Sequence, residues 1–152
     1  MVMSFVTTIP VMFPCSQRKV FRALCDLESH PLWNIGMTSI STTEPMYQGL
    51  RYETTTVMPG GLPNVSQIEV IRLQEPNEIE LISRSGAITY HARFALAGDA
   101  PDQTMVTCHL KFEFNAFVVN LTKTAIESMA SARVRANLEA LRALIDPVQP
   151  EN

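Results

Sequence analysis

Residues 88–146, ITYHARFALAGDAPDQTMVTCHLKFEFNAFVVNLTKTAIESMASARVRANLEALRALID, decide the fold. Apolar and polar side chains alternate over 88–98 and over 103–114, and a turn beginning at Gly98 separates the two segments. This alternation is typical of two antiparallel strands joined as a hairpin. From Phe117 to Asp146 there is neither Gly nor Pro, which predicts one long helix that Pro147 ends. Because a sheet must cover its apolar face, we expect an α+β fold in which the sheet grips this helix.

The side-chain pattern also sets the register of this hairpin. Pairing Tyr90 with Phe112 and Phe94 with Cys108 puts apolar or amphipathic residues on one face throughout. A slip of one residue would place the charged residues inside, because side chains alternate with a period of two. We therefore predict that these four residues face inward and that the histidines on both strands face outward.

The upstream chain predicts shorter elements. A helix is expected over 16–26, with Ser16 as its N-cap, and a one-turn segment over 28–34. Further strands are expected at 4–12, 37–44, 48–58, 64–74 and 78–85. The spacing predicts an antiparallel meander of about seven strands, with two short helices between its first two strands.

The turn at Glu75-Pro76-Asn77 allows a second register to be written. Pairing Leu73 with Ile79 puts Arg72 opposite Glu80 on the other face, a favourable charge pair. Followed outward, the same register places Glu69 and Ser83 on the inner face. A buried carboxylate needs a partner, and Arg133 in the apolar arc of the long helix is the candidate.

The middle of the long helix contains mostly small side chains between Ala125 and Ala136. Under a curved sheet they would leave a cavity, or alternatively would let helix and sheet pack closely. Arg133 and Asn137 lie one turn apart near the centre of this face.

Size and charge exclude several classes of function. The chain has 152 residues and a formal net charge of -3, which favours one domain and gives no reason to expect a nucleic-acid partner. No apolar run approaches the ~20 residues that span a bilayer, and the first residues lack a signal-peptide pattern. The three cysteines form no CxxC motif, so we expect reduced thiols and a cytoplasmic location.

Metal and cofactor sites are not indicated. His30, His91 and His109 are too scattered on this register for a metal site, and no phosphate-binding glycine motif occurs. Cys108 faces inward without an inward histidine beside it, so no nucleophile is predicted.

Several stretches together resemble the START-like, or SRPBCC, superfamily, which includes polyketide cyclase/dehydratase-like and Bet v 1-like proteins. They are PCSQRKVFRALCD at 14–26, HPLWN at 30–34, QGLRY at 48–52, the strand–Pro turn–strand unit at 68–83, and RANL at 135–138. The resemblance implies a helix-grip fold over 1–147. The tail at 148–152 is short, polar and broken by proline, so we expect it to be loose. It also implies a deep apolar cavity between the sheet and the last helix, used to bind lipids, polyketides or similar small molecules.

The candidate ligand-binding residues combine this resemblance with the registers above: Trp33, Tyr52, Glu69, Tyr90, Phe112, Met129, Arg133 and Asn137. Each also has a purely structural alternative, such as a core aromatic residue or an ion pair. The loop Pro59–Pro63 is expected to be either a lid over the pocket or an ordinary hairpin connection.

Three functions follow as alternatives. The first is binding of a small, largely apolar molecule. The second is a cyclase- or dehydratase-like enzyme that uses Glu69 with a tyrosine or Arg133 as acid and base. The third is a protein-interaction module, which an exposed apolar patch without a cavity would favour. A homodimer through an edge strand is left open.

Overall fold

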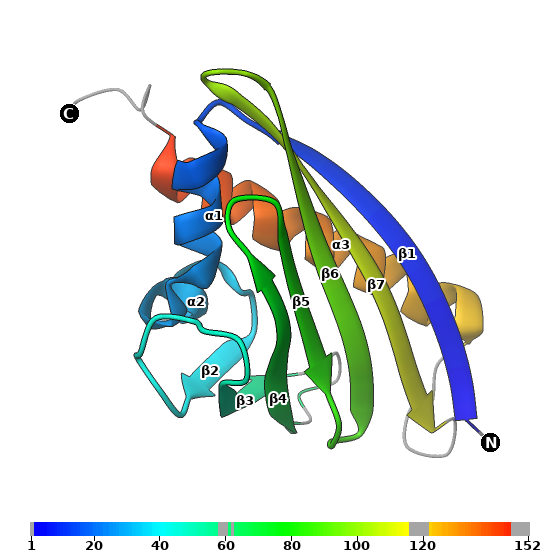
Figure 1. Ribbon diagram of the computed structural model, residues 1–152. Coiled ribbons are helices and arrows are strands. Elements are labelled where there is room, and N and C mark those ends of the chain that lie inside the picture. Colours follow the sequence, from blue (N-terminus) through cyan, green and yellow to red (C-terminus); the bar gives the residue numbers. More distant parts are fainter. Residues whose placement is uncertain (1, 58–60, 62, 116–121, 147–152) are drawn as a thin grey trace.

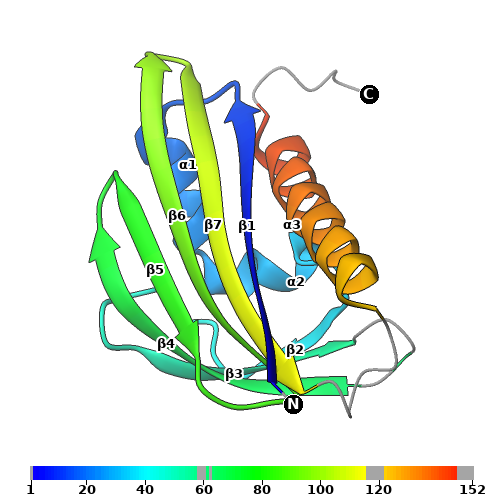
Figure 2. The same ribbon diagram turned by 90° about the vertical axis from the view of Figure 1, so that its right-hand side faces the viewer.

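The computed structural model describes residues 2–57, 61, 63–115 and 122–146. A curved seven-stranded antiparallel sheet wraps around one long helix, and two short helices lie at one end of it (Figures 1 and 2). The strands are β1 (Val2–Phe13), β2 (Met37–Ile40), β3 (Arg51–Val57), β4 (Pro63–Gln74), β5 (Glu78–Ser83), β6 (Ile88–Ala100) and β7 (Gln103–Asn115). The helices are α1 (Gln17–Cys25), a 3-10 turn (Leu27–Ser29), α2 (His30–Trp33) and α3 (Lys123–Ile145). This confirms the predicted helix-grip α+β fold.

The sheet order is β1-β7-β6-β5-β4-β3-β2, so every strand after β2 pairs with its neighbour in sequence and β1 closes onto β7. The edge strands are β1 and β2, and any pairing between copies through an edge would involve one of them. No helix in the described part of the chain has the length and apolarity needed to cross a bilayer.

Two helix starts follow from their caps. The Ser16 hydroxyl accepts a hydrogen bond from the Lys19 amide at 3.3 Å, as predicted for the start of α1. The Thr122 hydroxyl accepts one from the Ala125 amide at 3.2 Å, and α3 begins after it. The predicted helix is therefore not continuous through residue 122; the stretch 117–121 of that prediction and the tail at 148–152 lie outside the described residues.

The hairpin of β6 and β7 has the predicted register. Tyr90 pairs with Phe112 and Phe94 with Cys108, whereas His91 and His109 lie on the outer face. The strict alternation of side chains fixed this register because any other choice would bury charge.

The register predicted for β4 is wrong beyond the residues nearest the turn at Glu75-Pro76-Asn77. Leu73 pairs with Ile79 as predicted, but a bulge between Val70 and Arg72 shifts the pairing, so that Val70 and not Ile71 lies opposite Leu81. One extra residue reverses which face each earlier side chain occupies. Val70 is fully buried, and Glu69 lies on the outer face.

The long helix covers only part of the inner face. It packs against β1 and α2, and the Ser131 and Thr7 hydroxyls lie 2.7 Å apart at this contact. In Figure 2, α3 lies on the side of β1, while β4 and β5 curve away on the far side.

Candidate ligand-binding pocket

A pocket of about 280 Å³ lies between the inner face of the sheet, α2 and α3. Most of its wall is apolar. It is built from the alternate strand residues that face inward and from one face of α3. The apolar lining includes Ile68, Ile79, Leu81, Ala92, Phe94, Leu110, Phe112, Ile126, Met129, Ala130, Val134 and Leu138. Of the small residues of α3, Ala130 thus faces the pocket, whereas Ser131 packs on β1.

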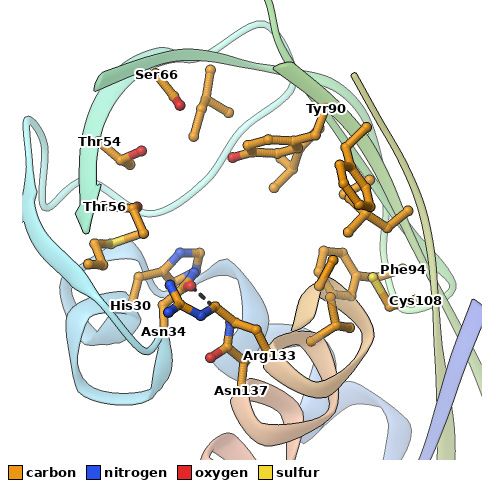
Figure 3. A pocket seen from close by; sticks show the side chains of 18 of the residues that line it. His30, Asn34, Thr54, Thr56, Ser66, Tyr90, Phe94, Cys108, Arg133 and Asn137 are labelled. Atoms are coloured by element: carbon orange, nitrogen blue, oxygen red, sulfur yellow. Dashed lines mark hydrogen bonds between the residues drawn. The ribbon is translucent and has the colours of Figure 1, made fainter. Parts of the chain in front are cut away.

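Polar groups line the pocket from the β3 and β4 side. Thr54, Thr56 and Ser66 contribute hydroxyls there, as Figure 3 shows, and Asn64 contributes an amide. None of these was predicted as a site residue. The two threonines share the inward parity of Tyr52 and could have been found by extending that strand, whereas the β4 bulge hid the residues of β4.

The Asn64 amide is fully used within the fold. Its oxygen accepts hydrogen bonds from the Ala87 and Ile88 amides at 2.8 and 3.3 Å, and its nitrogen donates to the Ser66 hydroxyl at 3.1 Å. Asn64 therefore fixes the turn between β5 and β6 against β4, and is less available to a ligand than the hydroxyls beside it.

Two tyrosines line the pocket as predicted. Burial raises the pKa of both Tyr52 and Tyr90, and in Tyr52 the neighbouring Tyr90 raises it further. The Tyr90 hydroxyl points into the pocket in Figure 3. Both phenols stay protonated at neutral pH, and neither hydrogen-bonds to another group in the described part of the chain, so each is available to a ligand.

His30 also lines the pocket, which corrects the prediction that no histidine faces inward. Its Nε2 lies 2.7 Å from the Leu24 carbonyl and donates to it, and its ring meets the Trp33 ring edge-on at 4.8 Å. Burial lowers the pKa of His30, so the imidazole is neutral at pH 7. The sequence signal for this position was the HPLWN stretch at 30–34, but His30 was predicted only to lie in a turn.

Trp33 lies in the pocket wall and is 4% exposed. Its indole Nε1 is buried without a hydrogen-bond partner among the described residues. Buried donors are nearly always paired, so this indole N–H in the pocket wall is a donor that a ligand acceptor could use.

Among the described residues that line the pocket, no nucleophile lies beside a base. Burial raises the pKa of Cys108 to about 12, which keeps the thiol protonated. Figure 3 places Cys108 and His30 on opposite sides of the pocket. No group of three or more potential metal ligands occurs among the described residues.

Arg133 and Asn137 join α3 to the segment after α2. Arg133 Nη1 donates to the Ile35 and Val57 carbonyls at 3.2 and 3.1 Å. The Asn137 oxygen accepts from the Ile35 amide at 2.8 Å, and its nitrogen donates to the Asn34 oxygen at 3.0 Å. Both residues line the pocket, and Figure 3 shows them grouped with Asn34 and His30 at one end of it.

The predicted partnership of Glu69 with Arg133 is wrong. Glu69 lies on the outer face, where its carboxylate pairs with Arg51 at 3.4 Å and Arg84 at 3.6 Å. The bulge in β4 is the physical reason, because it turns Ile68 and not Glu69 toward the pocket. The other seven predicted site residues all line the pocket.

A curved antiparallel sheet that holds one long helix over an apolar pocket defines the helix-grip, or START-like, class of proteins. The chain belongs to the family described as polyketide cyclase/dehydrase and lipid transport, whose model matches residues 4–146. No curated protein sequence matches the chain.

Solved structures show the same fold at low sequence identity. A START superfamily protein from Mycobacterium smegmatis has a TM-score of 0.76 at 16% identity, over 92% of this chain and 96% of that one. Norcoclaurine synthase from Thalictrum flavum, solved with dopamine and hydroxybenzaldehyde, has a TM-score of 0.70 at 10% identity, over 99% and 91%. The di-domain ARO/CYC StfQ of the steffimycin biosynthetic pathway has a TM-score of 0.74 at 10% identity, over 92% of this chain and 50% of that one.

Proposed function

We propose that this protein binds a small, largely apolar molecule in the pocket between the sheet and α3. The observation that carries the proposal is the pocket itself, an apolar space with a few polar groups on its wall. Ligand sites in proteins have this composition, and their volumes begin at roughly 300 Å³. Membership of a family described by lipid transport and polyketide cyclisation supports the same function.

The interaction-module alternative is disfavoured by the pocket, because an exposed apolar patch without a cavity was the feature expected for it. Three free cysteines, two of them buried, agree with the proposed cytoplasmic location.

The test is titration with the neutral fluorophore N-phenyl-1-naphthylamine. We expect saturable binding accompanied by quenching of Trp33, the only tryptophan in the chain, because it lies in the pocket wall. Ala130→Phe fills the pocket from α3 and should weaken binding by on the order of tenfold.

The matched control is Ala132→Phe, which adds the same ring at an exposed position of α3. It should leave the affinity within about twofold of wild type. No saturable binding to wild type, or equal losses in the two variants, would contradict the proposed function.

A second candidate is an enzyme of cyclase or dehydratase type, and one observation favours it. Because Nε2 of the neutral His30 donates to the Leu24 carbonyl, Nδ1 carries a lone pair and can act as a base. No Asp or Glu lines the pocket among the described residues, so the role given to Glu69 would pass to His30.

This enzyme would convert an aromatic or polyketone substrate at a rate that depends on His30. His30→Gln should then abolish turnover while N-phenyl-1-naphthylamine still binds. Turnover that persists in His30→Gln would exclude this role for His30.

A further inference from the structure

One end of the pocket contains hydrogen-bond donors and a positive charge without a matching acid. Arg133 lines the pocket, yet the ion pairs of the described residues join other cations to Glu69, Glu75, Glu78 and Glu80, and none includes Arg133. The pocket lining, within the part of the chain that the structure describes, contains no Asp or Glu. Among the described residues, the guanidinium is thus the one permanent charge on this wall, and no acidic side chain pairs with it.

The hydrogen bonds of Arg133 leave one edge of the guanidinium available. Its hydrogen bonds to the described residues both use Nη1, which donates to the Ile35 and Val57 carbonyls. The group has five N–H donors, and Nε with Nη2 forms the edge that binds a carboxylate through two parallel hydrogen bonds. No described residue accepts a hydrogen bond from that edge.

The fold fixes the position of this group. Gly36 has a φ of +87°, and a Cβ built on it would lie 2.8 Å from Arg133 Nη1, so only glycine leaves room for the guanidinium there. The two carbonyls then hold Nη1 from β3 and from the segment after α2. A guanidinium anchored in this way is already oriented before the ligand arrives, which lowers the entropy cost of binding.

Neighbouring groups at this end are donors or neutral. The Asn34 oxygen accepts from Asn137, which leaves the Asn34 nitrogen as a donor beside Arg133 (Figure 3). His30 is neutral and adds no charge of either sign. Such a surface is complementary to an anion. A neutral carbonyl ligand would leave the positive charge of Arg133 without a negative partner.

We infer that the ligand is an apolar molecule with one carboxylate, which the Nε and Nη2 edge of Arg133 binds while the apolar body fills the pocket. This inference rests on the proposed function, which concerns only the apolar body. It assigns Arg133 as a specificity-determining residue and organic acids as the ligand class.

The test uses competition between matched ligands at pH 7. Displacement of N-phenyl-1-naphthylamine by 2-naphthoate and by 2-naphthamide compares an acid with a neutral molecule of nearly the same shape. In wild type we expect the acid to bind on the order of ten- to a hundredfold more tightly, since charged hydrogen bonds contribute about that much. Arg133→Gln should abolish this preference, so that 2-naphthoate and 2-naphthamide bind within about twofold of each other.

Two further variants keep the result interpretable. Arg135→Gln removes the same charge from an exposed position of α3 and should keep the acid preference. Arg133→Lys retains the charge but loses the two parallel donors of the guanidinium, so it should keep only part of the acid preference. If Arg133→Gln fails to fold, the wild-type ratio and Arg133→Lys still decide the outcome.

The outcomes separate the two claims. If the neutral probe does not bind wild type, the proposed function fails. If the probe binds but naphthoate has no advantage over naphthamide, or if Arg133→Gln weakens both equally, the assignment of Arg133 to a carboxylate is overturned and the pocket remains.

Discussion

At the scale of single residues, Gly36 connects backbone geometry to the pocket. Gly36→Ala should lower the free energy of unfolding by about 2 kcal/mol, because alanine is strained at positive φ and its Cβ would displace the Arg133 guanidinium. It should also reduce the preference for 2-naphthoate. Urea unfolding and the competition assay measure the two effects.

Gly49 provides the control, because its φ is +95° and a Cβ there would meet nothing within 4 Å. Gly49→Ala should cost only the strain, about 1 kcal/mol, and leave ligand preference unchanged. Equal effects of the two substitutions on the acid preference would show that Gly36 does not position Arg133.

His30 gives the pocket a pH dependence on its acid side. Burial lowers the pKa of His30 in the folded state, while the unfolded chain has the ordinary value of about 6.5. The unfolded state therefore takes up the proton first as the pH falls. Stability from the neutral imidazole is present above pH ~6.5 and is lost below it, by up to about 1.4 kcal/mol per pH unit.

His30→Gln removes this titration and keeps an amide donor for the Leu24 carbonyl. Urea unfolding at pH 7.5 and 5.5 should show a smaller loss of stability in this variant than in wild type, by about 1 kcal/mol. Parallel profiles for His30→Gln and wild type would contradict the assigned burial of a neutral imidazole.

At the scale of elements, the β4 bulge decides which side chains of this strand line the pocket and which lie on the outer surface. Glu69 pairs there with Arg51 and Arg84, whose side chains are 80% and 62% exposed, and such pairs contribute less than about 1 kcal/mol. Glu69→Gln should therefore leave both the affinity for N-phenyl-1-naphthylamine and the acid preference unchanged.

Ile68 is the matched position, since it precedes Glu69 and lines the pocket. Ile68→Phe should weaken the binding of the neutral probe by narrowing the pocket, whereas Glu69→Gln should not. A large loss of binding in Glu69→Gln would place its carboxylate in the pocket and contradict the bulged register.

The elements also show which features were predictable from sequence. The β6–β7 register was predictable because charged and apolar residues alternate without interruption. In β4 the sequence around Val70-Ile71-Arg72 fits either parity, and a bulge is settled by how the strand curves against β5. That single ambiguity placed Glu69 wrongly and hid Ser66 from the predicted site.

At the scale of the whole molecule, the position of α3 creates the pocket. The helix packs on β1 and α2, and Arg133 and Asn137 tie it to the segment after α2, so the curved sheet opposite β1 is left partly uncovered. The long helix and its apolar face were predictable from composition. Thr54 and Thr56 follow the inward parity of Tyr52. That they share one site with His30 depends on the curvature of the sheet, which no local pattern specifies.

The central claim is that the inner face of this sheet binds an apolar ligand, and the most direct measurement is an amide and indole NMR titration with N-phenyl-1-naphthylamine. The chain has one tryptophan, so the Trp33 indole N–H gives a single resolved side-chain signal from the pocket wall. We predict that this signal and the amides of Ile68, Tyr90 and Ala130 shift together and saturate, while those of Glu69 and His91 on the outer face change little. Saturation without movement of the indole signal, or shifts confined to the outer face, would contradict the claim.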